Sequence, residues 1–99
     1  MNTGIELIAT ERQRQIAEEG WTAEHDSQHT EGELAMAAIA YIEADDTDEP
    51  GKLFTAASGF WPWSGEWWKP KDRIRNLVSA GALIAAEIDR LLQLKGGKE

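Results

Sequence analysis

The apolar repeat near the carboxyl end constrains the fold more than any other feature of this sequence. Between residues 70 and 96, apolar side chains recur at steps of three and four residues, which places them on one face of an α-helix. Pro70 and Asp72 suit the first turn of a helix, and Gly96 suits its end. We therefore predict one long helix here. Its apolar positions are Ile74, Leu77, Val78, Gly81, Ile84, Ala85, Ile88, Leu91 and Leu92.

Two shorter helices are predicted earlier in the chain. Thr3 and Glu6 have the spacing of a capping box, in which each side chain satisfies the other residue's backbone N–H at a helix start. Thr30 and Glu33 repeat this spacing and introduce a second helix over residues 31–44. The apolar stripe expected on the first helix comprises Ile5, Ile8, Ala9 and Ile16.

The segments between these helices are predicted to be loops. The polar residues 21–29 indicate an ordered loop, residues 45–52 an acidic surface loop, residues 53–69 a Trp-rich excursion, and residues 96–99 a flexible tail. With 99 residues the chain forms one helical domain over residues 1–99. The predicted fold class is all-α: a small helical bundle of three main helices with an ordered Trp-rich loop. Because two short helices cannot cover the long stripe, we expect oligomerisation to complete the bundle.

Composition excludes several classes of partner. The formal net charge of −8 repels phosphate backbones and anionic lipid headgroups, so extended nucleic acid and membrane surfaces are not expected partners. The chain has no cysteine, which removes disulfides and thiolate metal sites. We find no signal-peptide pattern and no apolar run long enough to span a bilayer. These features favour the cytoplasm.

Carboxylates are the first group that suggests chemistry. Helical bundles that hydrolyse nucleotides hold Mg²⁺ through carboxylates that project inward from facing helices. Glu33 and Glu87 lie within or beside apolar stretches, where an unpaired charge would be costly. The alternative is that an acidic protein distributes its carboxylates over solvated faces and helix caps, as Glu33 would do for Thr30.

Histidine and cationic side chains form a second group of candidates. His25 and Asp26 lie in "HDSQH", where they either pin the loop by hydrogen bonds or position a water molecule for catalysis. Arg12 and Lys69 lie near predicted helix ends, where they either contact phosphate oxygens or form solvent-exposed ion pairs.

Tryptophans are concentrated in "FWPWSGEWWKP", residues 60–70. Indole rings stack on nucleobases, but they also fill the core beneath a small domain. We expect some of these rings to close the core. Trp67, together with Trp21 from the earlier loop, is expected to border a pocket and stack on a base.

Four segments, in order, resemble one known family. "ERQRQIAEEGWTAEHD", "GELAMAAIAY", "WPW…WWKP" and "LVSAGALIAAEIDRL" are similar to small phage and prophage proteins associated with dATP/dGTP diphosphohydrolases, relatives of the all-α MazG-like nucleotide pyrophosphohydrolases. The similarity covers roughly residues 10–92. It implies an oligomeric helical bundle in the cytoplasm of a bacterial host. It also implies that carboxylate-bound Mg²⁺ helps an activated water cleave a nucleoside triphosphate between its α- and β-phosphates.

The metal motif of that family is incomplete in this chain. Glu33 matches the second position of an E-x-x-E pair, but Thr30 stands where the first glutamate is expected, and Asn76 occupies a position where an acid would serve. The resemblance therefore implies a Mg²⁺ site built from the carboxylates that remain. These ligands are Glu18, Glu33 and Glu87.

The leading prediction is Mg²⁺-dependent hydrolysis of nucleoside triphosphates to a monophosphate and pyrophosphate. His25 or Asp26 would position water, and Arg12 and Lys69 would bind phosphates. The alternatives are a non-catalytic module that sequesters a nucleotide or nucleotide signal, a small inhibitor of a host protein, and a helical oligomer without a small ligand.

Overall fold

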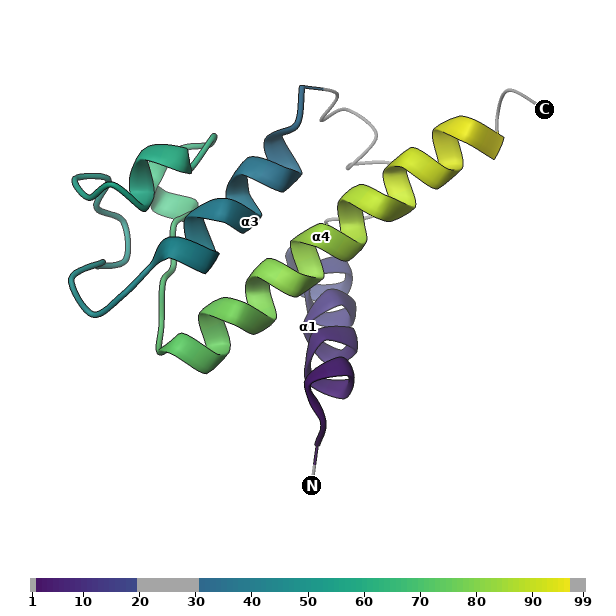
Figure 1. Ribbon diagram of the computed structural model, residues 1–99, viewed down its shortest axis with the longest axis horizontal. Coiled ribbons are helices and arrows are strands. Elements are labelled where there is room, and N and C mark those ends of the chain that lie inside the picture. Colours follow the sequence, from purple (N-terminus) through teal and green to yellow (C-terminus); the bar gives the residue numbers. More distant parts are fainter. Residues whose placement is uncertain (1, 20–30, 97–99) are drawn as a thin grey trace.

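The computed structural model describes residues 2–19 and 31–96, and within these ranges it is built from helices and turns without a strand. Three α-helices dominate: α1 (Gly4–Glu19), α3 (Glu33–Glu43) and the 24-residue α4 (Arg73–Gly96). Figure 1 shows α3 packed beside α4 and α1 crossing α4 steeply. The prediction of an all-α fold with three main helices is confirmed. None of the described helices has the length and apolar character needed to cross a bilayer.

Local side-chain bonds fix the predicted helix starts. At α1, the Thr3 N–H donates to Glu6 Oε1 at 2.8 Å and the Glu6 N–H donates to Thr3 Oγ1 at 3.3 Å, which is the predicted capping box. Before α4, Asp72 Oδ1 accepts the Arg75 N–H at 2.9 Å. Both helix starts therefore follow from their own sequences.

The start of α3 differs from the expectation. The helix begins at Glu33 rather than Glu31, because Gly32 adopts a left-handed conformation with φ of 80° that a helix cannot include. The Glu33 carboxylate accepts the Glu31 N–H at 2.7 Å. Thr30, its expected capping partner, lies outside the described residues.

Small residues and aromatic rings make the core. α3 and α4 pack closely because much of their interface is alanine. Tyr41 of α3 lies against two buried indoles, with its ring centroid 5.6 Å from that of Trp61 and 4.9 Å from that of Trp68. Part of the Trp-rich segment therefore belongs to the core. The buried α3–α4 side chains are Leu34, Ala37, Ala38, Ala40, Tyr41, Ala80, Leu83 and Ala86.

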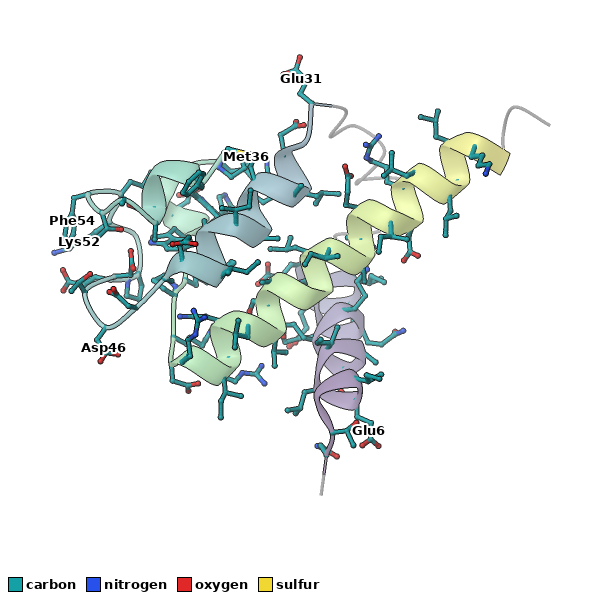
Figure 2. The ribbon with its side chains drawn as sticks, viewed as in Figure 1. Glu6, Glu31, Met36, Asp46, Lys52 and Phe54 are labelled. Carbon is teal, nitrogen blue, oxygen red and sulfur yellow. The ribbon has the colours of Figure 1, made fainter. Side chains whose placement is uncertain are left out.

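The segment from Asp45 to Phe60 is organised by hydrogen bonds between side chains and backbone. Asp45 Oδ1 accepts from the Thr47 N–H at 2.8 Å, and Asp48 accepts from the Thr55 hydroxyl. The segment ends in a short 3₁₀ helix, η1 (Ser58–Phe60), and a second one, η2 (Gly65–Trp67), follows. Figure 2 shows Asp46, Lys52 and Phe54 at the outer edge of this region, away from α4.

The predicted apolar stripe of α1 is wrong at Ile5 and Ala9, while Ile8 and Ile16 are partly buried. Ile5 is 82% exposed and Ala9 is also exposed, whereas Glu11, Arg12 and Gln15 are buried. The polar face of α1 packs inward because charged side chains on α4 and the Trp-rich segment offset the cost of burying its polar groups. An apolar contact that remains is that of Ile8, which packs directly on Gly81 of α4.

A side chain at Gly81 would require Ile8 to shift. A Cβ atom built at this position would lie 2.6 Å from Ile8 Cδ1 and 2.8 Å from Ile8 Cγ1. Gly81→Ala should therefore destabilise the protein by about 1–3 kcal/mol, although alanine is the better helix former. Urea unfolding followed by circular dichroism measures the change. Combination with Ile8→Ala should remove most of this clash, so equal costs of Gly81→Ala with and without Ile8 would contradict the prediction.

Candidate functional site

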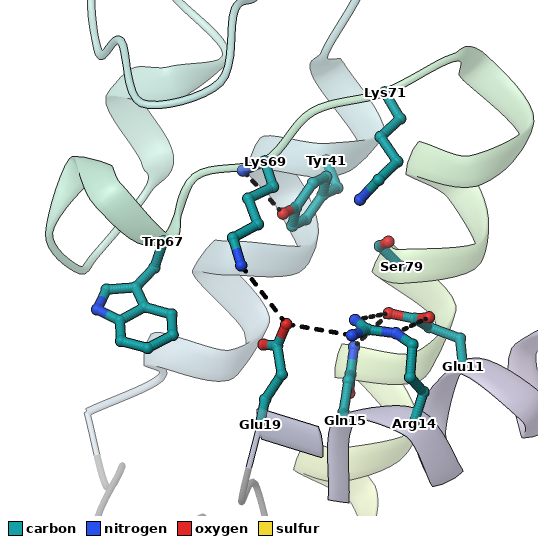
Figure 3. A pocket seen from close by; sticks show the side chains of 9 residues that line it. All are labelled: Glu11, Arg14, Gln15, Glu19, Tyr41, Trp67, Lys69, Lys71 and Ser79. Atoms are coloured by element: carbon teal, nitrogen blue, oxygen red, sulfur yellow. Dashed lines mark hydrogen bonds and ion pairs between the residues drawn. The ribbon is translucent and has the colours of Figure 1, made fainter. Parts of the chain in front are cut away.

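A polar pocket lies where α1, α3, α4 and the end of the Trp-rich segment meet. Its empty volume is about 310 Å³, including the open solvent at its mouth. Figure 3 shows Lys69 and Lys71 extending into it from one side, opposite Arg14 and Gln15 of α1. The lining residues are Glu11, Arg14, Gln15, Glu19, Tyr41, Trp67, Lys69, Lys71 and Ser79.

An ion pair between the buried Glu11 and the partly exposed Arg14 forms the floor of the pocket. Glu11 is 4% exposed, and Arg14 grips its carboxylate with two hydrogen bonds, both 2.8 Å long, from Nε and Nη2. Arg75 Nη2 of α4 approaches the same carboxylate at 3.5 Å. Because Glu11 lies between an arginine on α1 and one on α4, this contact joins the two helices.

The surroundings of Glu11 and Arg14 favour the charged forms of both side chains. Burial alone would raise the pKa of Glu11, but the hydrogen bonds and charge of Arg14, the charge of Arg75 and a hydrogen bond from Gln15 hold that pKa below its ordinary value. The pKa of Arg14 is raised, chiefly by its hydrogen bonds to Glu11. Both groups are therefore ionised at neutral pH.

The opposite wall combines a phenol, a lysine and an indole. The backbone N–H of Lys69 donates to the Tyr41 hydroxyl at 3.3 Å, and burial raises the pKa of Tyr41 to about 12. The Lys69 ammonium lies 3.8 Å from Glu19 and 5.6 Å from the ring centroid of Trp67. Glu19 also accepts from Arg14 at 3.2 Å. Tyr41 is thus neutral, and Lys69 is held at the mouth of the pocket.

Two polar groups of the pocket lack partners. Gln15 is 2% exposed, and its Oε1 accepts no hydrogen bond, while its Nε2 donates to Glu11 at 3.4 Å. The Lys71 ammonium makes no hydrogen bond or ion pair with any of the residues that the structure describes. Its backbone is fixed, because the Asn76 side chain accepts the Lys71 N–H at 2.6 Å and donates to its carbonyl at 2.9 Å. The buried Gln15 Oε1 and the ammonium of Lys71, whose backbone is fixed, therefore line the same pocket.

The structure brings two of the predicted site residues together. Lys69 and Trp67 both line the pocket. Arg12 is buried on α1 at 8% exposure and is not among the lining residues. Glu18, 67% exposed, lies 3.9 Å from Arg14 at the outer side. His25, Asp26 and Trp21 lie outside the described residues.

Glu33 and Glu87, the other predicted metal ligands, lie near an arginine. Arg90 Nε donates to Glu87 at 2.7 Å and its Nη2 donates to the second carboxylate oxygen at 3.2 Å. The pKa of Arg90 is raised, first by this hydrogen bonding and charge and also by the charge of Glu33. Within residues 2–19 and 31–96, no group of three or more acidic or histidine side chains is arranged to hold a metal ion. The Mg²⁺ site stays a prediction.

Several pocket residues are acidic or basic side chains that were not chosen as site residues from the sequence. Glu11, Arg14 and Gln15 lie three and four residues apart within "ERQRQ", so they share one helical face. That spacing could have indicated that the three side chains act together. It is equally typical of a solvent-exposed ion pair on a helix. Lys71 and Tyr41 gave no sequence signal that separated them from surface and core residues.

Replacement of Glu11 by Gln should alter the pH dependence of stability. Since its folded-state pKa lies below the ordinary value of 4.5, the ionised Glu11 stabilises the fold fully above that pH and progressively less as the pH falls below it. Glu11→Gln should cost about 1–3 kcal/mol at pH 7, because the charge of the carboxylate shared by Arg14 and Arg75 is removed, and less in acid. Urea unfolding from pH 7 to pH 3 measures this difference.

Glu66→Gln, which removes an exposed carboxylate on η2, is the matched control. A cost of Glu11→Gln that is the same at pH 7 and pH 3 would contradict the assigned role of Glu11.

No protein-family model, curated protein or solved structure matches this chain. What the pocket binds must therefore be inferred from the chemistry of its own side chains.

Proposed function

We propose that this protein binds a nucleoside phosphate in the pocket between α1, α3 and α4. The observation that carries the proposal is a pair of groups in this pocket: the buried Gln15 Oε1, which accepts no hydrogen bond, and the Lys71 ammonium, which has no partner within residues 2–19 and 31–96. An anionic oxygen of the ligand would pair with Lys71, and an N–H or O–H of the ligand would donate to Gln15. A nucleotide carries both kinds of group.

Local charge supports an anionic ligand. The net charge of the chain is −8, yet the cations in and next to the pocket outnumber its carboxylates. Glu11 and Glu19 are already contacted by arginine or lysine, which leaves Lys71 as the cation available to an incoming phosphate. Positive side chains still outnumber negative ones in and next to the pocket when the exposed Glu18 is counted. The four cations are Arg14, Lys69, Lys71 and Arg75.

The indole at the mouth supports an aromatic ligand. Trp67 is 43% exposed, in contrast to the fully buried Trp68 beside it. A nucleobase is planar and stacks on indole with little regard to its identity. The phosphate would lie inside the pocket near Lys71, and the base would lie against the exposed ring of Trp67. This arrangement accounts for the cationic groups and the exposed ring with a single ligand.

A second candidate function is Mg²⁺-dependent hydrolysis of the bound nucleotide, which the family resemblance implies. The observation that favours it is the position of Glu18, an exposed carboxylate 3.9 Å from Arg14, which lines the pocket. A metal ion held there would neutralise phosphate oxygens and orient a water molecule. His25 and Asp26 are the residues proposed to position that water.

Isothermal titration calorimetry with nucleoside mono-, di- and triphosphates tests the binding proposal. Wild-type protein should bind at least one of them in the presence of EDTA. Lys71→Ala should weaken this binding about tenfold or more, because a charge-assisted contact to phosphate is lost. Lys52→Ala, which removes an exposed lysine on the distant loop, should leave binding unchanged.

Failure of every nucleotide to bind would overturn the proposal. A host protein as the target would then be the better interpretation.

Release of pyrophosphate in the presence of Mg²⁺ tests hydrolysis separately. If the protein is an enzyme, Glu18→Gln should lower turnover at least tenfold while metal-free nucleotide binding persists. Glu43→Gln, an exposed carboxylate at the end of α3, is the control. Binding without turnover would assign the protein to the non-catalytic class, and turnover that survives EDTA would contradict the Mg²⁺ mechanism.

A further inference from the structure

We infer that the pocket selects a phosphate monoester, bound in its singly protonated form, over phosphodiesters and sulfate. This inference rests on the proposed function, since it concerns the phosphate end of the same ligand. Four side chains of the pocket carry it: the hydroxyl groups of Tyr41 and Ser79, the ammonium of Lys71 and the amide oxygen of Gln15. Figure 3 shows Tyr41, Lys71 and Ser79 turned toward the same space from α3, the segment before α4, and α4.

Three of these groups can donate hydrogen bonds to a ligand. The Tyr41 oxygen accepts the Lys69 N–H at 3.3 Å, so the phenol proton is left for another acceptor. Burial raises the pKa of Tyr41 to about 12, which keeps this proton in place at neutral pH. Ser79 adds a hydroxyl and Lys71 an ammonium, and neither side chain makes a hydrogen bond or ion pair with a residue that the structure describes. A ligand in this space therefore meets three donors.

Gln15 supplies the acceptor, and its orientation is fixed. Its Nε2 donates to the Glu11 carboxylate at 3.4 Å. Exchange of the amide oxygen and nitrogen would place the oxygen against a carboxylate that Arg14 and Arg75 keep ionised, which is repulsive. Gln15 Oε1 is therefore held as a buried acceptor, and a buried acceptor is costly to leave unpaired. The ligand must supply an N–H or O–H at this point.

An anion that meets three donors and one acceptor must keep a proton. A phosphate monoester does so, because its second pKa is about 6 and part of the population is singly protonated at neutral pH. Its P–O–H would donate to Gln15, while the remaining oxygens accept from the three donors. Sulfate, phosphodiesters and the internal phosphates of a polyphosphate hold no proton at this pH. The ligand therefore has a free terminal phosphate, and cyclic nucleotides, which are phosphodiesters, are poor ligands.

The charge of the site favours the same protonation state. With the exposed Glu18 counted, the side chains in and next to the pocket include one more cation than carboxylates. A singly protonated monoester carries one negative charge and balances this excess, whereas the dianion exceeds it. The titratable groups in and next to the pocket are the cations Arg14, Lys69, Lys71 and Arg75, the carboxylates Glu11, Glu18 and Glu19, and the phenol of Tyr41.

NMR titrations of the backbone amide signals with methyl phosphate and dimethyl phosphate test the inference. The two esters differ in a single methyl group, which replaces the ionisable proton. Methyl phosphate should bind at least tenfold more tightly near pH 6, and inorganic phosphate should exceed sulfate by a similar factor. The affinity for methyl phosphate should fall about tenfold for each pH unit above its second pKa. Dimethyl phosphate does not titrate in this range, so it reports any effect of pH on the protein itself.

Gln15→Met and Lys71→Ala separate the acceptor from the cation. Gln15→Met removes the amide at similar volume, so it should weaken methyl phosphate binding tenfold or more and leave dimethyl phosphate binding unchanged. Lys71→Ala should weaken the binding of both esters, because both are anions. Circular dichroism checks that each variant is folded. The comparison of ligands on wild-type protein stays decisive if Gln15→Met does not fold.

Equal or undetectable binding of the two esters by wild-type protein would overturn the inference. An affinity for methyl phosphate that rises with pH would also overturn it. Nucleotide binding without a preference for monoesters would contradict this inference alone and leave the proposed function in place. A preference for methyl phosphate without binding of any nucleotide would support the inference and contradict the proposed function.

Discussion

The contact of Glu11 with Arg14 and Arg75 is the interaction on which the site depends. α1 has little apolar surface directed at the rest of the protein, and it buries a carboxylate and a glutamine instead. A buried carboxylate is tolerated only when cations and hydrogen-bond donors surround it. Arg14 comes from α1 itself and Arg75 from α4, so the same contact neutralises the charge and fixes how α1 lies on α4. The pocket opens directly above this contact.

The Trp-rich segment contributes both to the core and to the candidate site. Trp61 and Trp68 are buried against Tyr41, and they anchor the segment to α3. That anchor places Trp67 and Lys69, their sequence neighbours, at the mouth of the pocket. Core and candidate site are therefore adjacent along the chain. The packing of Trp61 and Trp68 determines where Trp67 and Lys69 lie.

Much of the fold could be predicted from the sequence, since helix periodicity and capping act over a few residues. The long helix and the Thr3–Glu6 capping box are examples. The inward face of α1 could not be predicted, because apolar spacing favoured Ile5 while the packing partners of Glu11 lie on α4. Trp67 and Lys69 were predicted as site residues from residue type. Lys71 was missed because its role depends on Asn76, a contact between residues five positions apart that no local rule identifies.

The clamp of Asn76 on the Lys71 backbone has a consequence for recognition. A lysine on a mobile loop must lose both main-chain and side-chain freedom when it captures an anion, and that loss opposes binding. Here two hydrogen bonds from one amide already immobilise the main chain at Lys71. Only the aliphatic part of the Lys71 side chain would then lose conformational freedom if an anion bound, because its backbone is already fixed. If Lys71 binds an anion as proposed, this fixed backbone would lower the entropy cost of binding and restrict the positions at which the anion can be held.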